Sequence, residues 1–159
     1  MSIETSTIEE GSAAPDFALP RDGGGTVSLA EHAGKPVVVY FYPKDDTSGC
    51  TKEAIGFTER ADDFAAAGAV VIGISKDSVA SHDKFKAKHG LGIVLASDAE
   101  GDVCERYGVW VEKSMYGRKY MGIDRSTFLI KDGVVQKVWR KVKVPGHVDA
   151  VLEAVRDTA

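Results

Sequence analysis

Three short apolar runs, separated by segments with helical spacing, constrain the fold of this chain most strongly. The runs cover residues 37–41, 69–75 and 93–96, and they are rich in Val and Ile. Continuously apolar, β-branched runs of this length are typical of strands that are buried on both faces of a sheet. Residues 78–89 lie between two of them and predict a helix that ends before a glycine. This alternation indicates an α/β fold whose central strands are mostly parallel.

The two ends of the chain add hairpins and one amphipathic helix. Residues 16–19 and 26–29 flank a glycine-rich turn and predict an N-terminal β-hairpin. An Asp-Gly turn between residues 126–130 and 134–139 predicts a second hairpin, which makes the central sheet mixed and flanked by helices. The C-terminal helix is predicted by apolar residues at helical spacing, Val148, Val151, Leu152 and Val155.

Other segments carry weaker patterns. Residues 98–107 predict a short helix, and residues 109–122 show no clear period, so we expect them to be the least regular part. The polar and acidic residues 1–12 predict a flexible N-terminal arm, and residues 13–159 are expected to form a single domain. The large aromatic residues of the second half are expected to pack rather than to hold a cofactor, namely Trp110, Tyr120 and Trp139.

Composition and charge exclude several function classes. The net charge of −4 gives no support to nucleic-acid binding, and no apolar run approaches the ~20 residues of a membrane span. The first residues contain neither a basic nor a long apolar region, so we expect no secretory signal and a cytoplasmic location. No cysteine or histidine pair has zinc spacing and no dinucleotide fingerprint follows a strand, so we expect no metal and no cofactor.

Cys50 occupies the position with the most reactive chemistry. The strand at 37–41 ends in a polar loop that contains Pro43, and a helical pattern then begins. Cys50 is therefore expected at or just inside a helix N-terminus, where unpaired N–H groups and the helix dipole favour the thiolate. Since the thiolate is the nucleophile, this position predicts a reactive cysteine. The alternative is a small buried hydrophobic residue.

The residues around Cys50 resemble the active site of the peroxiredoxins. Pro43-x-x-x-Thr47-x-x-Cys50 matches the pattern of that family, and residues 41–54 resemble its Q type, also called bacterioferritin-comigratory protein. The resemblance spans nearly the whole chain after the first ten residues, with further matches at residues 14–17 and 119–130. It implies a thioredoxin-like fold with peroxiredoxin insertions, and a peroxidase that needs no haem, metal or flavin.

The same resemblance implies a role for each residue near Cys50. Cys50 would attack the terminal O–O bond of a hydroperoxide, become a sulfenic acid and release water or alcohol. Thr47 would place its hydroxyl beside the sulfur and the peroxide, and Arg125 would stabilise the thiolate and donate to the peroxide. Pro43 would shield the thiolate from water, and Glu53 is a candidate partner that orients Arg125.

Each of these residues also has an ordinary structural interpretation. Thr47 could be only a turn or cap residue, and Pro43 could only end the strand. Arg125 could form a surface salt bridge just before a strand, and Glu53 could be an exposed helix charge.

Cys104 is the point at which the chain departs from the commonest pattern. Many Q-type members carry a resolving cysteine five residues after the reactive one, where this chain has Ile55. Other members place it on the next helix, here residues 78–89, which contain no cysteine. We expect the helix of Cys104 on the opposite face of the sheet from Cys50. Because a disulfide needs Cα atoms within roughly 7 Å, Cys104 is expected to be structural rather than resolving.

The resemblance therefore implies a thiol-dependent peroxidase, and the expected position of Cys104 favours a one-cysteine cycle. Its substrates would be hydrogen peroxide and organic hydroperoxides, and thioredoxin or a small-molecule thiol would reduce Cys50 again. A monomer is expected, although a dimer is compatible with the sequence. The alternatives are a two-cysteine peroxidase with Cys104 as the resolving thiol, a disulfide reductase, which the missing Cys-x-x-Cys disfavours, and a non-enzymatic thioredoxin-fold binding module.

Overall fold

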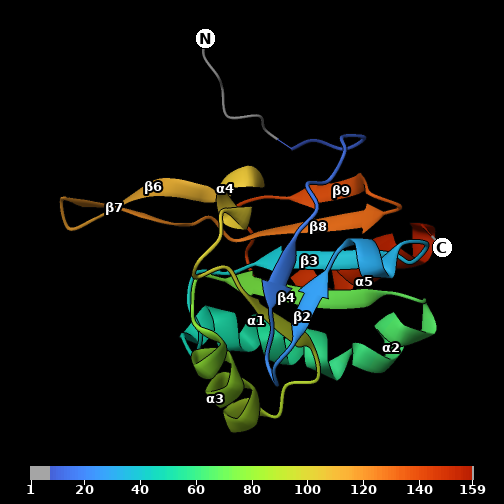
Figure 1. Cartoon of the computed structure of the whole chain (residues 1–159), viewed down its shortest axis with the longest axis horizontal. Coiled ribbons are helices and arrows are strands. Elements are labelled where there is room, and N and C mark those ends of the chain that lie inside the picture. Colours follow the sequence, from blue (N-terminus) through green and yellow to red (C-terminus); the bar gives the residue numbers. More distant parts are fainter. Residues whose placement is uncertain (1–7, 159) are drawn as a thin grey trace.

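A five-stranded mixed sheet lies at the centre of the computed structural model, which describes residues 8–158 (Figure 1). The first three strands in sheet order run parallel to one another, and the last two are each antiparallel to their neighbours. This arrangement confirms the predicted mixed sheet. The strands in sheet order are β5 (Val94–Ser97), β4 (Val70–Ser75), β3 (Val37–Phe41), β8 (Ser126–Lys131) and β9 (Val134–Trp139).

The central strand β3 separates two apolar cores. Val39 and Phe41 belong to one cluster of buried residues, and Val38 and Tyr40 belong to the other. Successive side chains of a strand point to opposite faces, so the two clusters lie on opposite sides of the sheet. The continuous apolar run at residues 37–41 is the sequence signature of this double burial.

Helices cover the face of the sheet on which Val38 and Tyr40 lie. The helical pattern after Cys50 forms two helices rather than one, because Arg60 leaves the helical conformation. Thr58 donates its hydroxyl to the carbonyl of Ala54 at 2.8 Å, a bond that bends helices. The helices with buried residues in this core are α1 (Ser48–Glu59), α2 (Ala61–Ala66), α3 (Val79–His89) and α5 (His147–Thr158).

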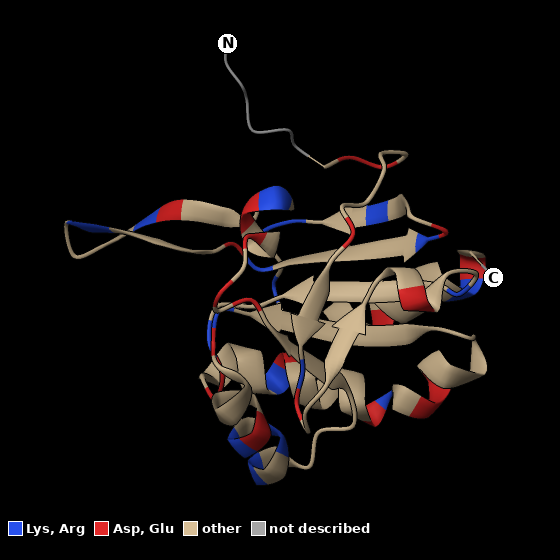
Figure 2. Cartoon of the chain, in the orientation of Figure 1, with Lys and Arg blue, Asp and Glu red and all other residues tan. Residues whose placement is uncertain are grey.

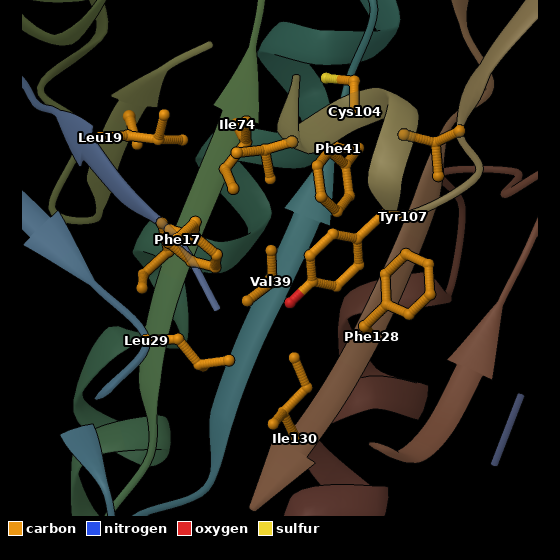
Figure 3. Packing of buried hydrophobic residues seen from close by; sticks show 14 of the residues in the cluster. Phe17, Leu19, Leu29, Val39, Phe41, Ile74, Cys104, Tyr107, Phe128 and Ile130 are labelled. Carbon is orange, nitrogen blue, oxygen red and sulfur yellow. The ribbon is translucent and has the colours of Figure 1, made fainter. Parts of the chain in front are cut away.

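The other face carries the N-terminal hairpin and the helix of Cys104 (Figure 3). The hairpin consists of β1 (Ala18–Pro20) and β2 (Thr26–Ser28), as predicted, and a 3-10 turn, η1 (Ala30–His32), follows it. Helix α4 (Val103–Arg106) is shorter than the predicted helix over residues 98–107. The carboxylate of Asp98 accepts hydrogen bonds from the backbone N–H groups of Val103 and Cys104, at 3.1 and 2.8 Å. Asp98 therefore lies outside the helix and caps its first turn, so α4 begins at Val103.

Residues 109–122 are regular, and the expectation of an irregular segment is wrong. They form an antiparallel hairpin of β6 (Trp110–Met115) and β7 (Arg118–Ile123) that extends away from the body (Figure 1). Both residues of its turn have positive φ, 53° and 78°, which is typical of tight hairpins. The turn residues Tyr-Gly lack the usual Asn or Asp signal. Tyr120 is 44% exposed, so the expectation that it packs is also wrong, whereas Trp110 and Trp139 contact the two cores.

Of the flexible arm predicted over residues 1–12, the structure describes residues 8–12, which contact the edge of the sheet. Ile8 is buried, and backbone hydrogen bonds of 2.8 and 2.9 Å join the residues after it to Val135 of β9. The edge strand thus gains a partner, which a polar sequence does not reveal. Residues 1–7 lie outside the described residues. Between residues 8 and 158, no helix has the length and hydrophobicity that a membrane crossing requires.

Candidate active site

Cys50 lies in the first turn of α1, beyond the C-terminal end of β3. Thr47 is the N-cap residue with an extended backbone, and its carbonyl accepts the first helical hydrogen bond, from Thr51 N–H at 2.8 Å. The thiol is therefore close to the unpaired N–H groups of the helix start, as the sequence predicted. Cys50 is only 1% exposed. Burial excludes water and strengthens the interaction of the sulfur with nearby charges.

Arg125 places a positive charge beside the sulfur of Cys50. Its Nη2 atom lies 3.3 Å from Cys50 Sγ, and its Nη1 atom donates to Glu53 Oε1 at 2.6 Å. Arg125 is in the short segment between β7 and β8, so the two arms of the site come from distant parts of the chain. A Cβ atom at Gly49 would lie 3.2 Å from Nη2, which shows how closely the guanidinium approaches the helix start. The structure thus brings Cys50, Glu53 and Arg125 together.

The carboxylate of Glu53 lies beside Arg125 and is fully buried. Burial raises its pKa to about 7, although the charge and the hydrogen bond of Arg125 act in the opposite direction. Its second oxygen, Oε2, has no hydrogen-bond partner among residues 8–158, and the same is true of the buried Tyr40 hydroxyl. Burial, and then the negative charges of Glu53 and Cys50, raise the pKa of Tyr40. Two buried oxygen atoms near Cys50, one on Glu53 and one on Tyr40, therefore have no hydrogen-bond partner among the described residues.

Thr47 and Pro43 stand on the exposed loop between β3 and α1. The Thr47 hydroxyl donates to the carbonyl of Lys44 at 2.9 Å, and it forms no capping bond to the helix. Pro43 comes two residues after the end of β3, where a residue without an N–H does not disturb the ladder. The ordinary structural roles of both residues are thus fulfilled. Their roles in peroxide binding stay predictions.

A buried polar cluster holds the loop before Cys50, and the sequence analysis missed it. Asp45 Oδ2 accepts from His82 Nδ1 at 2.7 Å, and Oδ1 accepts from the Tyr42 hydroxyl at 2.5 Å. His82 Nε2 donates to the carbonyl of Ala96 at 2.9 Å. Both ring nitrogens face acceptors, and although burial lowers the pKa of His82, the hydrogen bond and charge of Asp45 raise the net pKa, which favours the charged ring. Its place three residues before the buried Phe85 was the available signal, since both lie on one helix face.

Cys104 lies on the other side of the sheet from Cys50, as expected. It belongs to the core cluster with Phe41 and Ile74, whereas Cys50 belongs to the cluster with Tyr40 (Figure 3). Burial, and then the negative charge of Asp98, raise the pKa of the Cys104 thiol far above its usual range. Both cysteines are free thiols. Within the described residues, no group of three or more His, Cys, Asp or Glu could hold a metal ion.

Named proteins are similar in sequence to nearly the whole chain. A protein of Coxiella burnetii named putative peroxiredoxin bcp is 54% identical over 147 residues, which is 92% of this chain and 97% of the relative. Peroxiredoxin Bcp of Bacillus subtilis is 50% identical over 152 residues, with 95% and 97% of the two chains covered. Identity at this level over full length shows a common fold and family.

Solved structures give the same result. Bacterioferritin comigratory protein of Xanthomonas campestris, studied for its alkyl peroxide reduction activity, superposes with a TM-score of 0.87 at 46% identity, over 95% of this chain and 97% of that chain. PrxQ of Xylella fastidiosa superposes with a TM-score of 0.90 at 37% identity, over 96% and 98% of the two chains. These likenesses confirm the thioredoxin-like peroxiredoxin fold. The sequence profile of the AhpC/TSA family matches residues 11–138, and the chain belongs to that family.

Proposed function

We propose that this chain is a thiol-dependent peroxidase that reduces hydrogen peroxide and organic hydroperoxides through Cys50. The observation that carries the proposal is the 3.3 Å approach of Arg125 Nη2 to Cys50 Sγ at the start of α1. The names of the relatives, and the alkyl peroxide reduction studied for the Xanthomonas protein, support it. Residues 13–159 act as one catalytic domain.

The oxidation step uses the thiolate as the nucleophile. Cys50 Sγ attacks the terminal peroxide oxygen, an S–O bond forms, and the O–O bond breaks. The sulfur is oxidised by two electrons, and the leaving oxygen takes up a proton and departs as water or alcohol. Arg125 is the donor that faces both the sulfur and the site of the developing charge, so it stabilises the transition state. The Thr47 hydroxyl, on the exposed side of the loop, orients the peroxide.

Glu53 acts through Arg125 as a positioning residue. Its Oε1 atom fixes one edge of the guanidinium at 2.6 Å, so the other edge points at Cys50. Cys50 and Glu53 lie on α1, one turn apart. The helix therefore sets the spacing between the nucleophile and the carboxylate that anchors Arg125. Pro43 shields the outer side of the thiolate and fixes the loop. The exposed-charge interpretation of Glu53 is excluded by its burial.

The reducing half of the cycle uses a thiol from outside the chain. Cys104 is buried behind the sheet, and its thiol is a poor nucleophile because its pKa is raised. Ile55 stands at the nearer resolving position. The external reductant is thioredoxin or a small thiol, the active form is a monomer, and the cytoplasm is the compartment in which such thiols are plentiful. The two-cysteine cycle through Cys104 is the alternative.

A peroxide-consumption assay with dithiothreitol tests the function. The parent protein should consume peroxide steadily, Cys50→Ser should not, and Cys104→Ser should match the parent. Steady consumption separates a peroxidase from a binding module, and the absence of insulin disulfide reduction separates it from a disulfide reductase. If Cys50→Ser consumed peroxide as fast as the parent, the proposed function would be wrong.

A further inference from the structure

The β6–β7 hairpin exposes most of the large apolar side chains on the surface. Of the five large hydrophobic residues that are exposed among residues 8–158, four lie on this hairpin, and the fifth is Val134. Large apolar side chains that are exposed together on one element are typical of interaction sites. The four exposed residues are Met115 (55%), Tyr116 (95%), Tyr120 (44%) and Met121 (49%).

The hairpin is a separate two-stranded sheet and has no further strand partner among residues 8–158. Tyr120 lies opposite Lys113 on one face, and Met121 lies opposite Glu112 on the other. Both faces are exposed toward the tip, since every residue of β7 from Arg118 to Met121 is exposed. A lone hairpin gains little stability in water, so packing against a partner would stabilise it.

The charge of the hairpin is opposite to that of the chain. It carries three cations, Lys113, Arg118 and Lys119, and one anion, Glu112, whereas the whole chain has a net charge of −4. The basic residues stand out on the hairpin in Figure 2. None of these cations is ion-paired within residues 8–158. Two copies that met hairpin to hairpin would bring like charges together, so the surface favours an acidic partner over a second copy.

The hairpin is continuous with the active site. Strand β7 ends at Ile123, two residues before Arg125, which contacts Cys50. The six residues from Tyr120 to Arg125 are separated by five backbone steps, which span at most about 17 Å. A standard protein interface covers about 800 Å² per partner, a disc of about 16 Å radius. A protein that brings a thiol to Cys50 therefore reaches the base of the hairpin, and Tyr120 and Met121 lie near the edge of the area that it covers.

We propose that the β6–β7 hairpin is the docking arm for the dithiol protein that reduces oxidised Cys50. The proposal rests on the proposed peroxidase function and adds the surface and the chemistry of the partner. That partner presents an apolar patch with an acidic rim beside its reactive thiol. Tyr, Met and Arg, the residue types that the hairpin exposes, are enriched in protein interfaces.

The docked partner performs two thiol steps. Its first thiolate attacks the sulfur of the Cys50 sulfenic acid, an S–S bond forms, and water leaves with one added proton. Its second thiol attacks its own sulfur in this mixed disulfide, which releases Cys50 as a thiol and leaves the partner as an intramolecular disulfide. A small dithiol such as dithiothreitol performs the same steps without the hairpin surface.

Steady-state turnover with two reductants tests the proposal. Tyr120→Ser/Met121→Ser removes one exposed apolar side chain from each face of the hairpin, so the contact is weakened whichever face the partner covers, and Lys113→Glu/Arg118→Glu reverses the charge. With thioredoxin, thioredoxin reductase and NADPH, kcat/KM for thioredoxin should fall by about tenfold or more in each variant, in the range of interface hot spots. With dithiothreitol, each variant should stay within about twofold of the parent. Val134→Ser, an exposed apolar residue on another hairpin, is the matched control and should change neither rate.

The outcomes separate the proposal from the function beneath it. Unchanged thioredoxin kinetics in both double variants would overturn the docking arm, as would a parent that thioredoxin reduces no faster than dithiothreitol does. A parent that sediments as a dimer, and that Tyr120→Ser/Met121→Ser converts to a monomer, would assign the hairpin to a second copy instead. If the parent failed to consume peroxide with thioredoxin and also with dithiothreitol, the peroxidase function itself would be wrong.

Discussion

The Nη2 atom of Arg125 lies 3.3 Å from the sulfur of Cys50, although 75 positions separate the two residues in the chain. The contact exists because β3 and β8 are neighbours in the sheet, and Phe41 at the end of β3 pairs with Ser126 at the start of β8. The loop before α1 and the segment before β8 therefore meet at one edge. A buried thiol and a guanidinium placed in this way form a site for reactions that build negative charge.

Arg125→Lys keeps the charge but loses the planar pair of donors that bridges Glu53 and Cys50. We expect the rate constant of Cys50 oxidation to fall by about 10²-fold, which is about 2.7 kcal/mol. Rapid mixing with hydrogen peroxide measures it. Arg156→Lys, on the exposed face of α5, is the control and should stay within about twofold of the parent. If the rate constant of Arg125→Lys also stayed within about twofold of the parent, Arg125 would not stabilise the transition state.

Glu53→Gln tests the positioning residue. A neutral amide accepts a weaker hydrogen bond from Arg125, so Cys50 oxidation should slow by about three- to tenfold. The exposed Glu59→Gln on the same helix is the control and should leave the rate unchanged. A rate in Glu53→Gln equal to that of the parent would show that Arg125 needs no anchor.

The buried Glu53 carboxyl also makes stability depend on pH. Its pKa is raised from 4.5 to about 7 by burial, so the folded protein holds this proton to higher pH than the unfolded chain does. Between these two values, the Glu53 contribution to the free energy of unfolding falls as pH rises. Urea unfolding at several pH values should therefore give a flatter profile for Glu53→Gln than for the parent. Parallel profiles would contradict the raised pKa.

The Asp45–His82 pair also makes the free energy of unfolding fall as pH rises, but for a different reason than Glu53 does. Burial lowers the pKa of His82, but the hydrogen bond and charge of Asp45 outweigh it, so the net pKa is raised above 6.5. The stabilisation is fully present below that value and is lost as pH rises through the higher folded pKa. His82→Gln should cost about 3 kcal/mol near pH 6, and less at pH 9. His32→Gln is the control, and a cost that grew with pH would reject the ion pair.

Local patterns were enough to predict most of the sheet and the position of Cys50. The continuous apolar run of β3, the stripe of α5 and the Asp-Gly turn between β8 and β9 depend on neighbours in sequence, and the structure has them at those places. The β6–β7 hairpin was missed because its turn uses Tyr116 in a positive-φ conformation that bulky residues rarely adopt. Nothing local distinguishes such a turn from a loop.

The candidate site was only partly predictable for a different reason. Cys50 at a helix start is a local feature, but the charge that acts on it comes from Arg125, and only the family resemblance connected the two. The Asp45–His82 pair joins a loop to α3 across 37 positions, so no sequence spacing indicates it. Burial of Glu53 likewise depends on the packing of α1 on the sheet, which its sequence neighbours do not determine.

Cys104→Ser tests the structural role of the second cysteine. We expect turnover with dithiothreitol within about twofold of the parent, because this thiol takes no part in the cycle. The serine hydroxyl would be buried in an apolar cluster, so stability should fall by about 1–3 kcal/mol. Urea unfolding measures the loss. A strong loss of turnover with unchanged stability would indicate a resolving thiol.

The mass of the intact parent protein after one equivalent of hydrogen peroxide, without reductant, tests the one-cysteine cycle most directly. The account predicts a gain of one oxygen, about 16 Da, because the Cys50 sulfenic acid has no partner thiol within reach. Excess peroxide should add further oxygens to the same peptide. A loss of two hydrogens, about 2 Da, together with a Cys50–Cys104 peptide in the non-reduced digest, would contradict the account.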